Sequence, residues 1–442
     1  MHPFLLVAHV EQPGKIIGMQ KYKAPPGTHD VYPGASKWEE NSGKWNELES
    51  AFRDLCSIFG YGEIRTPIFE PTDLFTRAVG EGTDIVGKEM YTFRDRGDRS
   101  MTLRPEGTAP AIRAYLENSI YAEGGLTKLY YIGPIFRYER NQKGRYRQHS
   151  QCGIEALGSI EPDLDCEVIQ FALAFYKKIG IDRLDLKINS VGCPKCRPKY
   201  RDALLDFARP LLSQMSEDNQ RRFEENPLRM LDSKIHSDQD LLKDAPNLID
   251  FLCEDCRDHF DQVRSLLDRL SVPWQLDVRL VRGFDYYTKT AFEVQSPDLG
   301  AQSTLCGGGR YDGLVEELGG SPTPGIGFGL GIERALIALQ ALSQGTVDPR
   351  KVNSFMVTLG DRARSERPML LSRLRSKTVP IDVDYSGKSM KAQMRAADRS
   401  GARYAVIIGD NEIDRGTVQV KDMLTGEQTE VGFELLSEKL LS

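Results

Sequence analysis

Arg137 and Glu139 stand two residues apart at the end of an apolar stretch, directly before the polar, basic loop 140–150. Because side chains alternate across a strand, both would lie on the same face of a strand that ends there. A guanidinium on a rigid strand suits a phosphate, since its planar fork binds two oxygens at once. The mobile basic loop suits the end of a nucleic acid. The pair therefore predicts a site for a phosphate-bearing substrate.

A second candidate site is the glycine-rich stretch 324–331, in which Gly325, Gly327, Gly329 and Gly331 alternate with larger residues. Alternate glycines indicate that another group comes very close to the backbone. The stretch leads into a predicted helix whose first turn carries Arg334. The chain has no G-x-x-x-x-G-K-[ST] sequence, so a P-loop nucleotide site is excluded.

Four of the eight cysteines form two C-x-x-C pairs, Cys193 with Cys196 and Cys253 with Cys256. Two such pairs could supply four thiolates to a tetrahedral structural zinc ion. The separation of the pairs exceeds the usual finger spacing, so the pattern fits either a zinc site or a decaying one.

These residues need a scaffold, and the hydrophobic pattern predicts an α+β one. We expect a helix over 36–59, capped by Ser36 and ended by Gly60, and then an edge strand over 63–69 that contains Pro67. The further expected elements are a hairpin over 90–104, helices 108–118 and 163–178, strands 128–138, 151–158, 275–296 and 302–307, and a helix that starts near Gly331. A charged helical segment over about 190–270 interrupts the strand pattern and reads as an insertion.

From residue 353 onward the pattern changes to short alternating strands and helices, which predicts a small α/β domain with a mixed sheet. The linker before it is 345–352. Within this domain Lys388, Lys391, Arg395 and Arg399 recur at steps of three and four, so they would share one helix face. A solvated face is the default interpretation, and contact with nucleic-acid phosphates is the alternative.

Taken in order, residues 36–71, 128–158 and 324–340 resemble motifs 1, 2 and 3 of the class II aminoacyl-tRNA synthetases. The resemblance implies a catalytic domain over 19–345 with an antiparallel sheet flanked by helices, the helical insertion, and an anticodon-binding domain over 353–442. It also implies a homodimer formed through motif 1, with Pro67 as its proline. Residues 1–18 read as an N-terminal extension without a function.

Three further segments, 103–108, 282–287 and 307–313, resemble signatures of the histidyl-tRNA synthetases. By chemistry, Glu106, Thr108 and Gln151 suit the ammonium of an amino acid, and Glu155 with Tyr287 suits an imidazole. The histidine-binding residues that the resemblance implies are Glu106, Gly107, Thr108, Arg137, Gln151, Glu155, Arg282, Tyr286, Tyr287 and Tyr311. The ATP-binding residues that it implies are Arg137, Glu139, Arg145, Tyr146 and Arg334.

The resemblance implies ATP-dependent, Mg²⁺-assisted formation of histidyl-adenylate, followed by transfer of histidine to its tRNA. Arg137 and Arg282 would be the catalytic residues, because they meet the negative charge that develops at the α-phosphate. Arg140 and Gln142 of the loop would contact the tRNA, together with the C-terminal cations. The alternative function is that of a non-catalytic, histidine-binding regulatory subunit of ATP phosphoribosyltransferase.

Composition is consistent with a globular enzyme, at 442 residues, 40% hydrophobic and 28% charged. The formal net charge of −6 means that any tRNA contact depends on local basic patches. No apolar run is long enough to span a bilayer, and the N-terminus makes a poor signal peptide. We therefore expect a cytoplasmic protein with no membrane partner.

Overall fold

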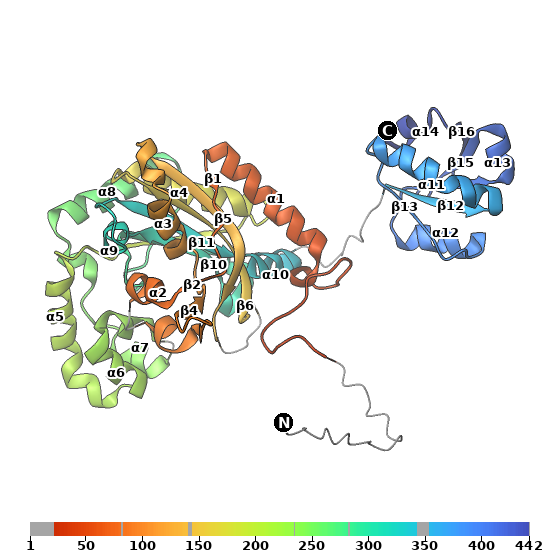
Figure 1. Ribbon diagram of the computed structural model, residues 1–442. Coiled ribbons are helices and arrows are strands. Elements are labelled where there is room, and N and C mark those ends of the chain that lie inside the picture. Colours follow the sequence, from red (N-terminus) through yellow and green to blue (C-terminus); the bar gives the residue numbers. More distant parts are fainter. Residues whose placement is uncertain are drawn as a thin grey trace, which may run out of the picture.

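The structure is a computed structural model that describes residues 22–80, 83–139, 144–233, 235–281, 283–342 and 353–441 (Figure 1). It contains an eight-stranded sheet, a three-stranded sheet and a separate five-stranded sheet near the C-terminus. The combination of a large, mainly antiparallel sheet with flanking helices and a C-terminal mixed sheet confirms the predicted α+β class.

The eight-stranded sheet has the order β1-β5-β6-β11-β10-β9-β7-β8. Its central strands are antiparallel, and only the outer pairs β1–β5 and β7–β8 are parallel. The strands are β1 Gly62–Glu63, β5 Thr127–Phe136, β6 Gln148–Leu157, β7 Asp185–Ser190, β8 Gln275–Leu276, β9 Thr288–Gln295, β10 Thr304–Arg310 and β11 Gly325–Gly331. The neighbouring strands β5 and β6 form a hairpin, and the predicted phosphate-binding segment with Arg137 and Glu139 connects them.

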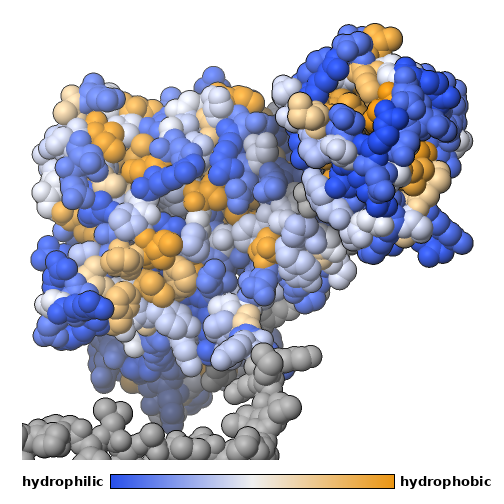
Figure 2. All heavy atoms as spheres, turned by 45° about the vertical axis from the view of Figure 1, so that its right-hand side comes forward, coloured by the Kyte–Doolittle hydropathy of each residue, from blue (hydrophilic) through white to orange (hydrophobic). Residues whose placement is uncertain are grey.

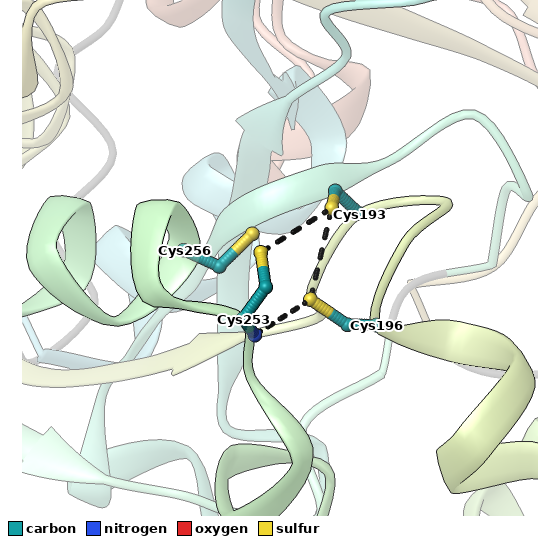
Figure 3. Close-up of side chains that lie close together, drawn as sticks. All are labelled: Cys193, Cys196, Cys253 and Cys256. Carbon is teal, nitrogen blue, oxygen red and sulfur yellow. Dashed lines mark hydrogen bonds between the residues drawn. The ribbon is translucent and has the colours of Figure 1, made fainter.

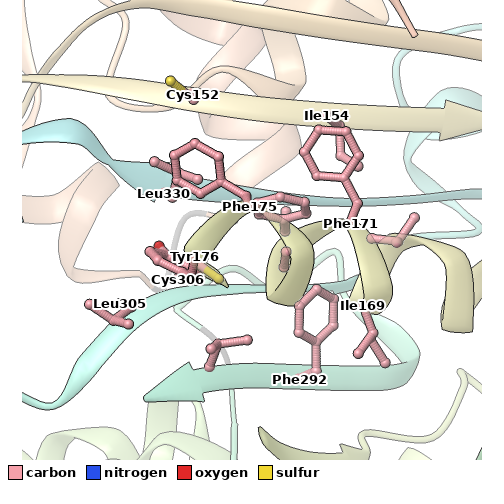
Figure 4. Packing of buried hydrophobic residues seen from close by; sticks show 14 of the residues in the cluster. Cys152, Ile154, Ile169, Phe171, Phe175, Tyr176, Phe292, Leu305, Cys306 and Leu330 are labelled. Carbon is pink, nitrogen blue, oxygen red and sulfur yellow. The ribbon is translucent and has the colours of Figure 1, made fainter. Parts of the chain in front are cut away.

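One face of this sheet is covered by α4 (Pro162–Lys178), as Figure 4 shows. Its aromatic side chains Phe171 and Phe175 are fully buried, and they are turned toward the strands that carry Ile154, Phe292 and Leu330. Tyr176 and Cys306 lie in the same layer. Burial of this apolar surface stabilises the sheet and fills this face with a packed core. Polar residues of a site on the sheet must therefore lie on the opposite face.

The predicted first helix is present as α1 (Ser42–Phe59), preceded by a 3-10 turn, η1, at Trp38–Glu40. Asn41 caps it by accepting hydrogen bonds from Gly43 N and Lys44 N, so the prediction that Ser36 is the cap is wrong. The side chain of Asn41 also donates to Ala35 O, which fixes it at this position. Gly60 ends the helix at a φ of 77°, as expected.

The predicted edge strand 63–69 is divided into two short strands. Its first part is β1, and its last residue begins β2 (Phe69–Pro71), which pairs with the hairpin β3 (Tyr91–Arg94) and β4 (Ser100–Leu103). Pro67 lies between the two strands, where its missing N–H costs no ladder bond. Arg104 ties this break to the large sheet by donating to Thr66 Oγ1 at 3.0 Å and to Pro134 O at 2.8 Å.

The helical insertion lies between β7 and β8, and Figure 1 shows its helices α5, α6 and α7 gathered together. Its helices are α5 Arg197–Ala208, η4 Arg209–Gln214, α6 Glu217–Glu225, η5 Pro227–Asp232, α7 His236–Leu241, η6 Leu248–Phe251 and α8 Glu254–Arg269. The remaining helices of this part are α2 Thr72–Val79, η2 Ile85–Glu89, α3 Thr108–Glu117, η3 Ile120–Glu123, η7 Pro297–Gln302, α9 Leu314–Glu317 and α10 Ile332–Leu342.

The expected strand 275–296 is only partly present. It is β8 and β9 separated by an irregular segment, 277–287, because hydrogen bonds to the insertion and to neighbouring loops replace the ladder there.

The C-terminal unit has the expected mixed sheet, in the order β13-β12-β14-β15-β16 with the first three strands parallel. The elements are β12 Ser354–Leu359, α11 Asp361–Ser376, β13 Ile381–Val383, α12 Met390–Arg399, β14 Tyr404–Gly409, α13 Asp410–Arg415, β15 Thr417–Asp422, β16 Gln428–Gly432 and α14 Leu436–Leu441. On the face drawn in Figure 2 this unit is largely hydrophilic. Among the described residues no helix is both long and apolar enough to cross a membrane.

Candidate active site

The hairpin β5–β6 places Arg137 directly beyond the last paired residue of β5. Its amide donates to Arg147 O at 2.9 Å, so the ladder continues through it and fixes its backbone. Its Nε donates to Pro105 O at 2.7 Å, and its guanidinium carbon lies 5.6 Å from the centre of the Phe284 ring. Within the described part of the chain, no partner is bonded to either Nη group, so both are available to a phosphate.

A cavity of about 420 Å³ opens beside this hairpin. All five residues predicted to bind ATP line it: four come from the segment between β5 and β6, and Arg334 comes from α10. Its lining also includes Gln151 and the glycines Gly307, Gly329 and Gly331. A cavity with several arginines and a glycine floor fits a polyphosphate that approaches the backbone closely.

The charges in this cavity are paired or held by the backbone. Arg145 Nη1 lies 3.3 Å from Glu139 Oε2, and Arg334 Nη1 donates to Thr304 O at 3.0 Å. Burial lowers the pKa of Arg334 from its ordinary value. Glu333, the residue before it, accepts from Ser150 N at 2.8 Å, and burial raises the pKa of its carboxyl to about 8.

Next to the cavity, Glu155 is the centre of a buried hydrogen-bond network. Thr108 Oγ1 donates to its Oε1 at 2.7 Å, the Tyr131 hydroxyl donates to the same oxygen at 3.3 Å, and the Tyr311 hydroxyl donates to Oε2. The side chain is 1% exposed, and burial raises the pKa of its carboxyl to about 8. A carboxyl group with this many hydroxyl donors is a preorganised polar group in a buried cluster of hydroxyl-bearing side chains.

Glycines make room for this network. A Cβ on Gly327 would lie 2.1 Å from Glu155 Oε2, and Cβ atoms on Gly107 and Gly153 would lie 2.2 and 2.4 Å from the Tyr131 ring. The rings of Tyr286 and Tyr287 are 4.7 Å apart, and Tyr286 lies 5.8 Å from Tyr311. The predicted histidine-binding residues that the structure describes are thus brought together around Glu155 and the mouth of the cavity.

Glu106 has a structural partner that the sequence did not indicate. Its carboxylate accepts from Thr108 N at 2.5 Å and from Ala109 N at 2.7 Å, so it caps the N-terminus of α3 from a buried position. Burial raises the pKa of Glu106. The helix end and the carboxylate stabilise each other, and they also fix Thr108 against Glu155.

Three predicted residues, Arg140, Gln142 and Arg282, lie outside the described residues, as does the extension 1–18. Conversely, sequence reasoning missed Tyr131 and His149. Tyr131 pairs with Gly153 in the register of β5 and β6, so it shares a face with Gln151 and Glu155, and the hairpin register was the signal that could have found it. His149 lines the cavity, and burial, together with the nearby Arg137, lowers its pKa to about 3.

The four paired cysteines meet in space, although Cys196 and Cys253 are far apart in sequence (Figure 3). Their Sγ atoms all lie within 4.8 Å of one another. The Cys193 Sγ is 3.6 Å from that of Cys196 and 3.8 Å from that of Cys253. The other four cysteines are buried singly, as expected.

The predicted C-terminal cations are all exposed, and three of them lie on α12. The opposite side of this helix is buried through Gln393 and Ala397, and Gln393 exchanges two hydrogen bonds with the backbone of Thr358. This packing turns Lys391, Arg395 and Arg399 toward solvent.

The fold, the order of the three motifs along the chain and the placement of motifs 2 and 3 beside the cavity define a class II aminoacyl-tRNA synthetase. A family model described as Histidyl-tRNA synthetase matches residues 27–335, and one described as Anticodon binding domain matches 352–442. The chain belongs to the histidyl-tRNA synthetase family.

Individual proteins that are similar to this chain point to the same family. The chain is 52% identical over 410 residues to the histidine–tRNA ligase of Pelotomaculum thermopropionicum, covering 93% of this chain and 95% of that one. It is 50% identical over 415 residues to that of Desulfitobacterium hafniense, covering 94% and 96%. The apo histidyl-tRNA synthetase of S. aureus is 40% identical with a TM-score of 0.79, covering 96% of this chain and 100% of that one. These relatives favour the ligase over the regulatory-subunit alternative.

Proposed function

We propose that this chain activates histidine with ATP in the Glu155 pocket and the adjoining cavity, and then transfers it to the 3′ end of its tRNA. The observation that carries the proposal is the buried Glu155 beside a cavity lined by Arg137 and Arg334. Glu155 already accepts from three hydroxyls, and an imidazole N–H adds one more donor to this buried group. An amino acid without that donor makes one hydrogen bond fewer in a buried site and binds less tightly.

In this proposal the amino acid carboxylate attacks the α-phosphorus of ATP. The new carboxyl–phosphorus bond gives histidyl-adenylate, the bond from the α-phosphorus to the bridging oxygen breaks, and pyrophosphate leaves. No general base is needed, because the carboxylate carries no proton to remove. Arg137, whose Nη groups have no partner among the described residues, and Arg282 stabilise the negative charge that develops there. Arg334 and Arg145 hold the remaining phosphates, and Glu139 with Tyr146 borders the adenine. Thr108, Gln151 and Glu106 receive the ammonium, so that rate enhancement comes from positioning and from charge neutralisation.

Mg²⁺ fits this cavity because Asp84, Glu89 and Glu139 line it and offer the oxygen ligands that this ion prefers. When bound with ATP it supplies further neutralisation of the phosphate charge. The chain's own contribution is the fixed arrangement of arginines around the reacting phosphate.

We further propose that Cys193, Cys196, Cys253 and Cys256 hold a structural zinc ion. Zinc–thiolate bonds of about 2.3 Å in a tetrahedron place sulfur atoms about 3.8 Å apart. The distances of 3.6 and 3.8 Å from Cys193 Sγ to its neighbours fit that arrangement. Such an ion would fasten the start of α5 to the start of α8, at the two ends of the insertion.

A homodimer is the proposed assembly. Ile68, Phe69 and Phe93 are 45%, 50% and 42% exposed, and the rings of Phe69 and Phe93 lie 6.1 Å apart on the three-stranded sheet next to Pro67. Contiguous exposed apolar residues are typical of a protein interface.

The proposed tRNA contacts are Arg140 and Gln142 of the loop, together with Lys388, Lys391, Arg395 and Arg399 of the C-terminal unit. The proposed location of the protein is the cytoplasm.

The direct test of the residue assignments is histidine-dependent ATP–pyrophosphate exchange by Arg137→Ala, Arg282→Ala and Arg334→Ala. Each should lose most of its kcat, and the exposed Arg364→Ala, on α11 of the C-terminal unit, should keep it. Exchange by Arg137→Ala at the wild-type rate would contradict the proposed phosphate-binding role of the hairpin.

A further inference from the structure

The segment 283–287 carries two rings of the proposed histidine pocket, Tyr286 and Tyr287, and the ring of Phe284, yet it has no regular secondary structure. Phe284 stacks on Tyr286 at 5.1 Å with an angle of 9° between the rings, and Arg137 lies over Phe284. The position of these rings therefore depends on whatever holds the backbone of the segment. Two arginines from other elements do so.

Arg197, the first residue of α5, reaches the segment from the cysteine cluster. Its Nη1 donates to Asp285 O at 3.3 Å, its Nη2 donates to Tyr287 O, and its Nε donates to Val191 O at 3.3 Å. The backbone of Arg197 is fixed in turn, because its amide donates to Cys193 O at 3.1 Å. The three carbonyls are met by three different nitrogens of one guanidinium, whereas the three donors of an ammonium all leave a single nitrogen and cannot span the same positions.

Arg229, on η5 of the helical insertion, holds the other end of the segment. Its Nη2 donates to Gly283 O, and the same group lies 3.7 Å from Asp285 Oδ1. Asn226, three residues earlier, donates to that carboxylate oxygen at 3.1 Å. Arg229 also lines the 420 Å³ cavity, so its position bears on the ATP side as well.

The segment 283–287 is not closely packed on every side. A second cavity of about 120 Å³ is lined by Arg197, Asn226, Arg229, Phe284 and Asp285. Because the segment is bordered by this space, packing alone does not fix it, and loss of an arginine would leave it room to take other conformations.

We propose that Arg197 and Arg229 are positioning residues that hold 283–287 in the conformation that histidine binding requires. The proposal rests on the proposed function of the Glu155 pocket. Neither arginine needs to touch histidine. Each raises the fraction of protein molecules whose pocket is in the conformation that binds histidine. The apparent Kd for histidine rises as that fraction falls. The cysteine cluster and the insertion thereby influence histidine affinity through one residue each.

The test is histidine-dependent ATP–pyrophosphate exchange by the full chain carrying Arg197→Ala or Arg229→Ala, with histidine affinity also measured by calorimetry without ATP. We expect the KM and Kd for histidine to rise about tenfold or more in both variants. The KM for ATP should stay within about twofold in Arg197→Ala, because Arg197 does not line the 420 Å³ cavity. Arg201→Ala, an exposed arginine on the same helix, is the matched control and should behave as wild type. Arg197→Lys should bind histidine more tightly than Arg197→Ala but more weakly than the wild type. If Arg197→Ala does not fold, Arg197→Lys replaces it in the test.

Unchanged histidine KM in the Ala variants would overturn the proposal. So would a parallel rise of both KM values with a lowered melting temperature, because that pattern indicates general destabilisation. Wild-type protein without histidine-dependent exchange would contradict the proposed function instead. If Tyr311→Phe loses histidine affinity and the arginine variants do not, the pocket stands and the positioning role fails.

Discussion

The Tyr311 hydroxyl donates a hydrogen bond to Oε2 of Glu155, and both side chains are at most 1% exposed. Tyr311 follows β10, whereas Glu155 lies on β6, and β11 separates the two strands in the sheet. Gly327 of that intervening strand has no side chain to block the contact. The pocket therefore exists because a glycine lets two distant polar groups meet across a strand.

Tyr311→Phe should weaken histidine use without affecting ATP. Loss of one hydrogen bond to a buried carboxylate lowers kcat/KM for histidine by about 10- to 100-fold. The measurement is the exchange reaction with histidine and ATP varied separately. Tyr385→Phe, which removes a hydroxyl from an exposed ring, is the control. Equal losses for histidine and ATP would argue against a pocket specific to the amino acid.

Glu155 should make stability depend on pH in a defined direction. Burial raises the pKa of its carboxyl from 4.5 to about 8, so the folded chain binds a proton that the unfolded chain releases between these values. The stabilisation is complete below about pH 4.5 and is lost as the pH rises through about 8. The apparent Tm of the wild type minus that of Glu155→Gln, taken from pH 5 to 9, should fall with pH. A difference that stays level or grows would contradict the shift.

Zinc should be present and structural. Purified chain should contain about one zinc ion, and Cys253→Ser should lose it and lower the apparent Tm by about 5 °C or more. Cys56→Ala, a buried cysteine outside the cluster, should keep its metal. Wild-type protein purified without chelator that contains no zinc would indicate a decayed site.

The cationic side chains of α12 should affect the binding of tRNA but not the activation of the amino acid. Reversing Lys391 and Arg395 to Glu should raise the KM for tRNA in aminoacylation by about tenfold or more and flatten its salt dependence, since fewer phosphates are neutralised. Amino acid activation should be unchanged. Arg364→Glu, on α11 of the same unit, is the matched control. A KM for tRNA equal to that of wild type would assign α12 to a solvated face.

Much of the site follows from local patterns. The apolar stretch predicts the strand that ends directly before Arg137, and the glycine run with Arg334 marks the strand-to-helix junction, as the structure has it. Glu139 lies beyond that strand, and its amide donates to Arg137 O, so the expected period of two does not reach it. The division of 63–69 at Pro67 and the cap at Asn41 were missed, because competing polar residues stand nearby and tertiary contacts choose between them. The contacts of Arg197 and Arg229 with 283–287 could not be predicted, since they join segments 54 to 90 residues apart through the packing of the insertion.

The most direct test of the whole account is ATP–pyrophosphate exchange by the wild-type chain, measured with each of the twenty amino acids in turn. The account predicts exchange with histidine alone, and its loss in Arg282→Ala. Histidine binding without exchange would contradict it and would point to the regulatory, non-catalytic relative. Exchange with another amino acid would contradict the assignment of the Glu155 pocket to an imidazole.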